Sequence, residues 1–376
     1  MSDERPGREV MPHSSLVTRH SSLPTRLLVA QTGFLGDVVL TTPLIAELRR
    51  RLTLASLTVL TTPQARPLLE QHPDVDRVLV DAKRGEGRGV LGLLRTAQRL
   101  RHEQFTLAVA PHKSLRTALL LALAGIPHRV GFRQSAGWFL YHHTAVREAQ
   151  RHEVERILCL MRVFGIEPEE CERTPRITYS EAARADARAL LNEAGVNDGE
   201  PVFVVCPGSV WPTKRWTIEG YAGLVRCLER DYSRVLLCGG PDDGPVVRAV
   251  QEQSGGHGVN LAGRGNLQTF MALIDRAQVV VSNDSAPMHM AVARGVPVVA
   301  IFCATTPSLG YGPYSERAVI VEKKDLFCRP CSPHGGLSCP RGTEDCMRLI
   351  TVNDVLAGVN QLLARTAGLR RVTGDR

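Results

Sequence analysis

CPGSVWPTKRW, at residues 206–216, and SNDSAPMH, at residues 282–289, each follow a short β-branched run and precede a segment with helical periodicity. In parallel α/β proteins, loops of this kind lie at the carboxyl ends of the strands, where ligands bind. The free amides at the start of a helix attract anions, although a serine or aspartate beside them can instead act as a helix cap. Two such loops in one half of the chain predict a phosphate-binding site rather than two isolated caps.

Short apolar runs alternate with segments of helical periodicity along the whole chain. This alternation is typical of parallel sheets with helices on both faces, and a chain of 376 residues exceeds what one core usually supports. The sequence therefore predicts an α/β protein with two domains. The expected strands lie at residues 27–30, 57–61, 77–80, 107–110, 129–131, 202–205, 235–237, 278–281 and 298–301.

The expected domain boundary lies in residues 167–178, a segment rich in proline, glutamate and arginine. We therefore predict an N-terminal domain at residues 25–175 and a C-terminal domain at residues 176–376. Residues 1–24 are polar and have no apolar core, so we expect a disordered tail there rather than a secretory signal. The last helix is a candidate for packing back on the N-terminal domain.

The composition is that of an ordinary globular protein, with 43% hydrophobic and 22% charged residues. A net charge of +8 and a pI near 9.1 indicate an anionic partner. Aromatic residues make up only 5% of the chain and no nucleic-acid-binding motif is present, so we do not expect a nucleic-acid partner. The apolar stretches are far shorter than the roughly 20 residues that a membrane helix needs, and we expect a cytoplasmic protein.

Beyond these general features, the two loops resemble the paired signatures of the ADP-heptose:lipopolysaccharide heptosyltransferases (glycosyltransferase family 9), most closely their heptosyltransferase II branch. The resemblance runs from about Arg26 to about Leu363 and includes GFLGD at 33–37, AGIPHRVGF at 124–132 and GYGP at 310–313. It implies the GT-B architecture, in which two Rossmann-like doubly wound domains face a central cleft. The N-terminal domain would then bind the acceptor and the C-terminal domain the ADP-heptose donor.

The resemblance also implies a reaction. It is the inverting transfer of L-glycero-D-manno-heptose from ADP-heptose to a heptose of the lipopolysaccharide inner core, carried on Kdo-lipid A. Because that acceptor is a membrane glycolipid, we expect the protein to rest peripherally on the inner face of the inner membrane. GT-B enzymes generally stabilise the leaving nucleotide without a bound metal, so no cofactor is expected for catalysis.

The first strand is followed by the loop QTGFLGD at residues 31–37, whose two glycines allow a close backbone approach. Asp37 falls at the start of the next helix, where a carboxylate can act as a cap that the helix dipole stabilises. In the family the aspartate of this Gly-Asp motif is the proposed catalytic base, and Asp37 stands at the matching position. We therefore predict that Asp37 takes the proton of the acceptor hydroxyl, with Gly36 beside the acceptor.

In the C-terminal half, Lys214 is the predicted counter-charge for the leaving ADP, because a cation at a helix start opposes the dipole unless an anion lies beside it. His289 lies four residues after Ser285, on the same helix face, and matches a histidine of the family pattern. Asp242 has two interpretations, a hydrogen bond to a sugar hydroxyl or a turn and helix cap. The predicted donor-binding residues are Ser209, Thr213, Lys214, Asp242, Asp284, Ser285, Ala286 and His289.

Acceptor contacts are predicted after the strand at residues 107–110, again at a carboxyl end. There His112, Lys113 and Arg116 can meet carboxylate or phosphate groups of the lipopolysaccharide core. The residues that we assign to a solvated surface instead are His142, His143 and Arg147.

Four of the ten cysteines cluster near the C-terminus, in an insert at residues 328–346. Cys328 and Cys331 have the spacing of a zinc-ligand pair, but Cys339 and Cys346 do not repeat it. In a reducing cytoplasm disulfides are the weaker explanation, and free thiols in a compact lobe are the alternative to a metal. The four residues form a candidate structural zinc site, separate from catalysis.

Three other functions fit part of the sequence. A GT-B transferase with another nucleotide-sugar or acceptor would differ in its nucleotide preference. A non-catalytic nucleotide-sugar-binding protein would bind ADP without turnover, and the intact Asp37 argues against it. An NAD-dependent dehydrogenase is disfavoured, because the full Gly-x-Gly-x-x-Gly pattern is missing and a second, basic phosphate loop is present.

Overall fold

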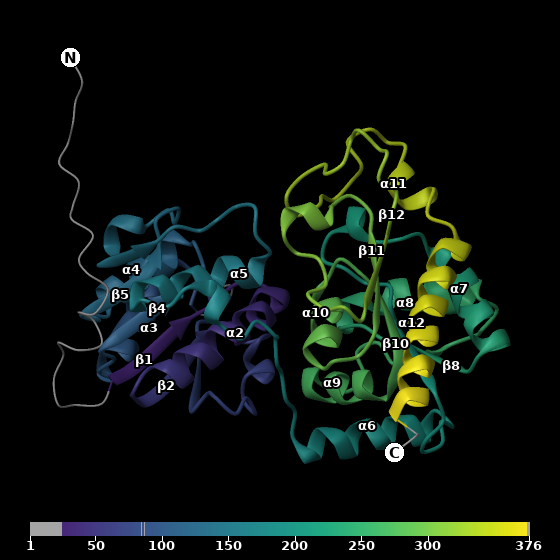
Figure 1. Cartoon of the computed structure of the whole chain (residues 1–376), viewed down its shortest axis with the longest axis horizontal. Helices are drawn as coiled ribbons and strands as arrows, with labels where there is room; N and C mark the ends of the chain where they lie inside the picture. Colours follow the sequence, from purple (N-terminus) through teal and green to yellow (C-terminus); the bar gives the residue numbers. More distant parts are fainter. Residues whose placement is uncertain (1–24, 84, 86, 374–376) are drawn as a thin grey trace.

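The computed structural model describes the backbone of residues 25–83, 85 and 87–373, and the side chains of residues 26–365 within these ranges. It contains two six-stranded parallel sheets, each flanked by helices (Figure 1). This arrangement confirms the predicted α/β class. The tail predicted at residues 1–24 lies outside the described residues.

The first sheet has the strand order β3-β2-β1-β4-β5-β6. Helix α2 begins directly after the central strand, and Leu40, Leu44 and Leu48 recur every fourth residue along its buried face. The strands are β1 (Thr25–Ala30), β2 (Leu54–Thr61), β3 (Arg77–Val80), β4 (Leu107–Ala110), β5 (His128–Phe132) and β6 (His143–Ala145). The helices are α2 (Leu35–Arg51), α3 (Gly89–His102), α4 (Leu115–Leu123) and α5 (Glu153–Leu158), with the 3₁₀ helices η1 (Arg66–Leu68), η2 (Trp138–Leu140), η3 (Cys159–Phe164) and η4 (Pro168–Glu170).

The second sheet has the order β12-β11-β10-β7-β8-β9. Counted from the start of its own half, each sheet follows the order third, second, first, fourth, fifth, sixth, which is the doubly wound Rossmann order that was predicted. The strands are β7 (Val202–Cys206), β8 (Arg234–Leu237), β9 (Val259–Asn260), β10 (Ala277–Asn283), β11 (Val298–Phe302) and β12 (Ala318–Glu322). The helices are α6 (Glu181–Glu193), α7 (Ile218–Asp231), α8 (Gly244–Gln253), α9 (Leu267–Arg276), α10 (Ala286–Ala293), α11 (Asp345–Arg348) and α12 (Val352–Thr373), with η5 (Pro212–Lys214), η6 (Pro241–Asp243) and η7 (Pro307–Leu309).

The last helix, α12, packs against β12, β11, β10 and α7 of the second sheet. Its residues Val355, Val359 and Leu362 recur at helical spacing and are buried in that domain's core. The described side chains of α12 therefore lie on the C-terminal sheet, which corrects the expectation that this helix packs back on the N-terminal domain. Residues 172–180, in the segment where we placed the domain boundary, form neither helix nor strand.

The two domains meet where α2 packs against α10. Apolar residues of both helices, among them Leu44 and Met288, belong to one continuous buried cluster. Each helix follows a central strand of its own sheet, so the contact brings the carboxyl ends of β1 and β10 toward each other (Figure 1). Among the described residues, no helix is both long enough and apolar enough to cross a bilayer.

Candidate active site

One buried amide ties the two loops of the C-terminal domain together. Asn283 ends β10, and its Oδ1 accepts hydrogen bonds from the Trp216 N–H at 2.9 Å and the Tyr221 hydroxyl at 2.8 Å. Its Nδ2 donates to the carbonyls of Pro207 at 2.9 Å and Gly208 at 3.2 Å. The residue positions one loop on the other, and sequence reasoning missed it because a loop asparagine gives no sign of its partners.

Lys214 lies in η5, and its Nζ forms an ion pair with Oδ2 of Asp284 at 2.7 Å. The Thr305 hydroxyl donates to the same oxygen at 2.7 Å. The two charged side chains are only 15% and 7% exposed. Both residues were predicted to contact the donor, but Asp284 instead holds the ammonium, which has three N–H donors and so keeps others for a ligand.

Two of the hydroxyl residues predicted to bind the donor lie in the loop that carries Lys214, and they differ in their surroundings. The Thr213 hydroxyl donates to the Gly336 carbonyl at 3.1 Å and accepts from the Gly336 N–H at 2.7 Å. This hydroxyl is therefore engaged with the cysteine-rich insert. Ser209 is buried, and its carbonyl accepts from the Arg215 guanidinium at 2.6 Å. Lys214 is thus the residue of this loop whose charged group remains available to a ligand.

Helix α10 begins without a side-chain cap. Ser285 occupies the cap position, but its hydroxyl lies 3.2 Å from Oγ of Ser282, and the carboxylate of Asp284 faces Lys214. The capping alternative raised by the sequence does not apply to this helix. In its first turn Pro287 has no N–H and the Met288 N–H donates to the Ser285 carbonyl at 3.1 Å, so the Ala286 N–H is the backbone donor that can meet an anion there.

The turn at η6 contains two neighbouring acids with different roles. The Asp243 carboxylate accepts the Gly240 N–H at 2.9 Å, and it lies so close to Gly208 that a Cβ there would meet Oδ1 at 2.1 Å. Asp243 is therefore the turn residue. Asp242 is exposed beside it, and its contact with a sugar hydroxyl stays a prediction.

Asp37 is the third residue of α2, and its Oδ2 accepts the Phe34 N–H at 2.9 Å, so the side chain does cap the helix. Burial raises the pKa of this carboxyl, although the Phe34 N–H and three cations act in the opposite direction. A raised pKa brings an aspartate closer to the range of a general base at neutral pH. The three cations are Arg147, Lys214 and Lys83, so both domains contribute charge to this carboxylate.

A second charged cluster around Asp37 was missed by sequence reasoning. Arg147, assigned to a solvated surface, is only 12% exposed and forms an ion pair with Glu153, so that assignment is wrong. The pKa of Glu153 is raised, chiefly by burial and also by the negative charge of Asp37. The positive charge of Arg147 acts in the opposite direction. Burial also raises the pKa of Tyr311, and the charges of Glu153 and Asp37 add to this effect. The GYGP motif therefore belongs to the surroundings of Asp37.

The GYGP motif also joins the C-terminal domain to the N-terminal domain. Gly310 has φ +93°, and a Cβ there would lie 2.6 Å from the guanidinium of Arg156, so glycine is required twice over. The Glu153 N–H donates to the Gly310 carbonyl at 2.8 Å. The ring of His152 donates through Nε2 to the Gly312 carbonyl at 2.8 Å. These contacts hold the C-terminal domain on α5, beside Asp37.

We predict that a methyl group at Gly33 displaces the Asp37 carboxylate. A Cβ at Gly33 would lie 2.6 Å from Asp37 Oδ2, too close for the carboxylate to stay in place. Because misplacing a reacting group by about 1 Å can cost about 100-fold, Gly33→Ala should lower kcat by about 10- to 100-fold without weakening nucleotide binding. Steady-state kinetics test this against Gly85→Ala, where the nearest atom would be 3.8 Å away. A normal kcat for Gly33→Ala would contradict the role given to the carboxylate.

His289 meets the N-terminal domain at Gly36, where a Cβ would lie 3.0 Å from the Cδ2 of the ring. The glycine therefore allows the histidine to approach α2. His289 is 5% exposed, and its Nδ1 has no hydrogen-bond partner among the described residues. Burial lowers its pKa to about 4, so the ring is neutral at pH 7. A neutral ring can form a hydrogen bond with the nucleotide-sugar through one of its nitrogens, but it brings no positive charge to it.

We expect His289 to make the protein less stable as the pH falls from about 6.5 to about 4. Its pKa is about 4 in the fold and about 6.5 in an unfolded chain, so the unfolded state binds the extra proton in this interval. The loss is on the order of 3 kcal/mol of unfolding free energy. In His289→Gln this loss should be absent, which urea unfolding at both ends of the interval measures, with the exposed His102→Gln as the control. The same pH dependence in wild type and His289→Gln would contradict the assignment.

Two of the predicted acceptor residues lie at the same edge as Asp37. His112 Nδ1 is 3.3 Å from Oγ1 of Thr32, which joins the end of β4 to the loop after β1. Burial lowers the His112 pKa to about 4, so this ring is also neutral at pH 7. Lys113 is exposed, and its charge interacts with Glu153 next to Asp37. These two side chains can face an acceptor.

Arg116, the third predicted acceptor residue, is engaged elsewhere. Its guanidinium pairs with the buried Asp81 at 3.1 Å and donates to the Gly87 carbonyl at 3.0 Å. The residue holds the loop after β3 on α4. Its predicted contact with the acceptor would have to compete with these partners.

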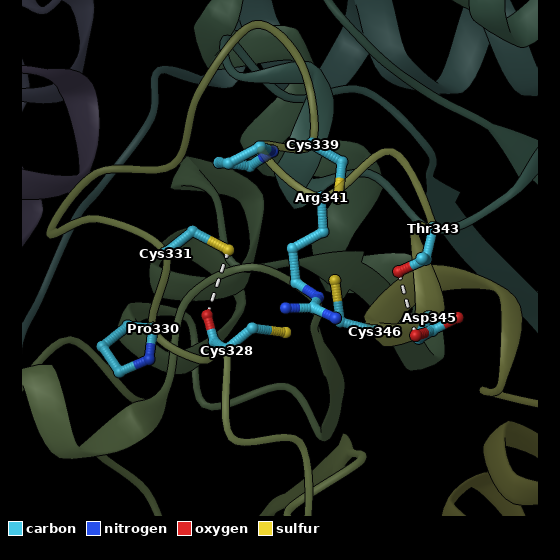
Figure 2. Close-up of a pocket in the computed structure, with 9 residues that line it drawn as sticks. Cys328, Pro330, Cys331, Cys339, Arg341, Thr343, Asp345 and Cys346 are labelled. Atoms are coloured by element: carbon cyan, nitrogen blue, oxygen red, sulfur yellow. Dashed lines mark hydrogen bonds between the residues drawn. The ribbon is translucent and has the colours of Figure 1, made fainter.

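The four cysteines of the insert line one cavity of about 210 Å³ (Figure 2). Among the described residues, no three side chains of the metal-binding kinds are grouped closely enough to hold an ion as they stand. The four residues around the cavity are Cys328, Cys331, Cys339 and Cys346.

Comparison with known proteins gives a consistent result. The model of glycosyltransferase family 9 (heptosyltransferase) matches residues 93–335. Lipooligosaccharide heptosyltransferase 2 of Haemophilus influenzae is 28% identical over 90% of this chain and 99% of its own length. Lipopolysaccharide heptosyltransferase 3 of Escherichia coli K12 is 29% identical over 72% of this chain and 80% of its own length.

A solved structure agrees with the fold. The structure of the E. coli ADP-heptose lps heptosyltransferase II has a TM-score of 0.75 at 26% identity, covering 91% of this chain and all of the other. This likeness, together with the two Rossmann-ordered sheets, confirms the GT-B architecture.

Proposed function

The chain belongs to glycosyltransferase family 9, the heptosyltransferases, and as a glycosyltransferase of this family we propose that it transfers heptose from ADP-heptose to the lipopolysaccharide core. The observation that carries the proposal is the packing of α2, which carries Asp37, against α10 of the C-terminal domain, where a Cβ at Gly36 would lie 3.0 Å from the His289 ring. Asp37 belongs to the N-terminal domain and Lys214 to the C-terminal domain, and the charge of Lys214 lowers the pKa of the Asp37 carboxyl. A base from one domain and a counter-charge from the other are what a displacement at a nucleotide-sugar needs.

In the proposed reaction the acceptor hydroxyl attacks the anomeric carbon of the heptose while Asp37 accepts its proton. The bond from the anomeric carbon to the diphosphate oxygen breaks, and ADP leaves with the electron pair. Lys214 and the Ala286 N–H at the start of α10 stabilise the new charge. A single displacement inverts the anomeric centre. Since Lys214 supplies the positive charge, we propose that this step needs no bound metal.

For the finer specificity, we propose that the acceptor is a heptose of the inner core, as for a heptosyltransferase II. The support is the likeness to lipooligosaccharide heptosyltransferase 2 over nearly its whole length. A heptosyltransferase 3 matches at a similar identity over a shorter range, so the acceptor has to be decided by experiment.

We further propose that the protein works at the cytoplasmic side and rests on the inner face of the inner membrane. A net charge of +8 suits an anionic glycolipid surface. Trp138 and Phe139, which are 54% and 63% exposed, stand next to the start of α4 at the acceptor side. An exposed aromatic pair in a basic protein fits an interfacial contact.

The nucleotide preference tests this function against its rivals. We expect release of ADP from ADP-heptose in the presence of a core acceptor, with stronger inhibition by ADP than by UDP or GDP. Preference for UDP or GDP would favour a GT-B transferase with another donor. ADP binding without turnover on heptose-bearing or heptose-free acceptors would favour a non-catalytic nucleotide-sugar-binding protein.

A further inference from the structure

Arg147 and Glu153 form a buried ion pair near Asp37, and no step of the proposed reaction uses either residue. Arg147 follows β6, and Glu153 is the first residue of α5, which packs against α2 (Figure 1). The two side chains are 12% and 9% exposed. A buried ion pair adds little stability compared with apolar residues of similar size, so its presence beside the proposed base points to a role in the reaction.

The two members of the pair are held by the fold in different ways. The Gln134 side chain accepts the Arg147 N–H at 3.0 Å and donates to the Arg147 carbonyl at 3.1 Å, which fixes the backbone but not the guanidinium. The Glu153 N–H donates to the Gly310 carbonyl at 2.8 Å, and Nη1 of Arg156 lies 3.3 Å from Glu153 Oε2. Among the described residues, the Arg147 guanidinium has Glu153 as its only hydrogen-bond partner. Glu153 is therefore the anchored member, and it decides where the guanidinium lies.

Without Glu153, the nearest alternative partner for Arg147 is the Asp37 carboxylate. Within the part of the chain that the structure describes, Asp37 forms no ion pair, and its Oδ2 alone is engaged, by the Phe34 N–H at 2.9 Å. Burial raises the Asp37 pKa, and of the three cations that act against this effect Arg147 has the largest influence. A guanidinium paired directly with this carboxylate would occupy the oxygen that has to accept the proton and would make it a weaker base.

We propose that Glu153 is a positioning residue, which holds the Arg147 guanidinium to one side of the Asp37 carboxylate and so leaves that carboxylate free to accept the proton of the acceptor. This role rests on the proposed function of Asp37 as the base. Glu153 acts through Arg147 and touches no substrate. Its negative charge also offsets part of the positive charge of Arg147 at Asp37, so the loss of one member should have the opposite effect to the loss of the other.

Other charged and titratable groups stand on the elements around Asp37. They are the same in every variant compared below, so a difference between two variants reports on the ion pair. The groups are Lys83 after β3, Lys214 of η5, Glu155 and Arg156 of α5, His289 of α10 and Tyr311 after η7.

The first test follows the titration of Asp37 in the full-length protein without any substrate. The carbon-13 NMR signal of its carboxyl group, identified by its absence in Asp37→Asn, reports the pKa directly. In Glu153→Met the released Arg147 should lower this pKa by about one unit or more. Arg147→Met should raise it, and the double variant should return toward wild type. An unchanged Asp37 pKa in Glu153→Met, or a shift that the double variant does not reverse, would overturn the proposal.

Glu148→Met is the matched control for this titration. Glu148 lies in the same stretch of chain and also pairs with two arginines, Arg151 and Arg162. Its substitution should leave both the Asp37 pKa and kcat unchanged. Glu153→Gln, which can keep a weaker hydrogen bond to Arg147, should shift the Asp37 pKa in the same direction as Glu153→Met but by less, and it replaces that variant if methionine prevents folding.

Turnover separates a positioning role from a purely structural one. Glu153→Met should lower kcat at pH 7 by about tenfold, and the addition of Arg147→Met should restore most of it. If the loss persists in the double variant, Glu153 serves only the fold and the proposal is wrong. If wild type shows no turnover on any acceptor, the proposed function fails, while the titration of Asp37 still decides whether Glu153 holds Arg147 away from it.

Discussion

Asp37→Asn is expected to lose about two to four orders of magnitude of turnover while it still binds ADP. The amide oxygen of asparagine can accept the Phe34 N–H as the carboxylate does at 2.9 Å, so the cap on α2 is kept. What is lost is the group that accepts a proton. Since the substitution also removes a negative charge near Lys214, ADP affinity should stay the same or rise.

The pH dependence of kcat/KM is a second test of Asp37 as the general base. Burial raises the Asp37 pKa, and the base must be ionised to act. Activity is therefore lost as the pH falls through that raised pKa, and the acid limb of kcat/KM should lie above the ordinary range of an aspartate. If Asp37→Asn is as stable and as active as wild type, the side chain of Asp37 serves only to cap α2 and is not the general base.

Lys214→Met is expected to lower kcat/KM by about 100- to 1000-fold and to destabilise the fold as well. Methionine keeps much of the length of lysine but not its charge. The Asp284 carboxylate, 7% exposed, then loses the ammonium that lies 2.7 Å away. An uncompensated buried charge of this kind costs about 3 to 5 kcal/mol of unfolding free energy.

The paired substitution Lys214→Met with Asp284→Asn separates these two effects. It removes the orphaned charge, and the Thr305 hydroxyl can still donate to the amide oxygen. We expect stability to recover toward that of wild type while kcat/KM stays low. Recovery of activity along with stability would mean that Lys214 serves the fold and not the leaving ADP.

Much of the fold could be predicted from the sequence, because buried parallel strands read as short apolar runs and their alternation with helices is a local pattern. The two loops predicted to bind phosphate could be located for the same reason, since each follows a strand and precedes a helix. The last helix was placed wrongly because its apolar face shows that it packs but not on which domain.

The polar contacts inside the site could not be predicted, because they join residues far apart in the chain. Lys214 and Asp284 were both assigned to the donor, whereas the fold pairs them with each other. Arg147 was assigned to the surface, whereas in the fold it is 12% exposed and forms an ion pair with Glu153, and its charge acts on Asp37. The glycine at 36 is explained by a side chain of the opposite domain, and the glycine at 310 by its positive φ together with such a side chain.

The most direct test of the proposed transfer offers ADP-heptose with three purified acceptors: Kdo-lipid A without heptose, with one heptose and with two. Intact mass of the lipid product is measured beside ADP release. We predict a gain of one heptosyl residue on the acceptor that already carries one heptose, and none with Asp37→Asn. Transfer only to heptose-free Kdo-lipid A, or ADP binding without a product on any acceptor, would contradict it.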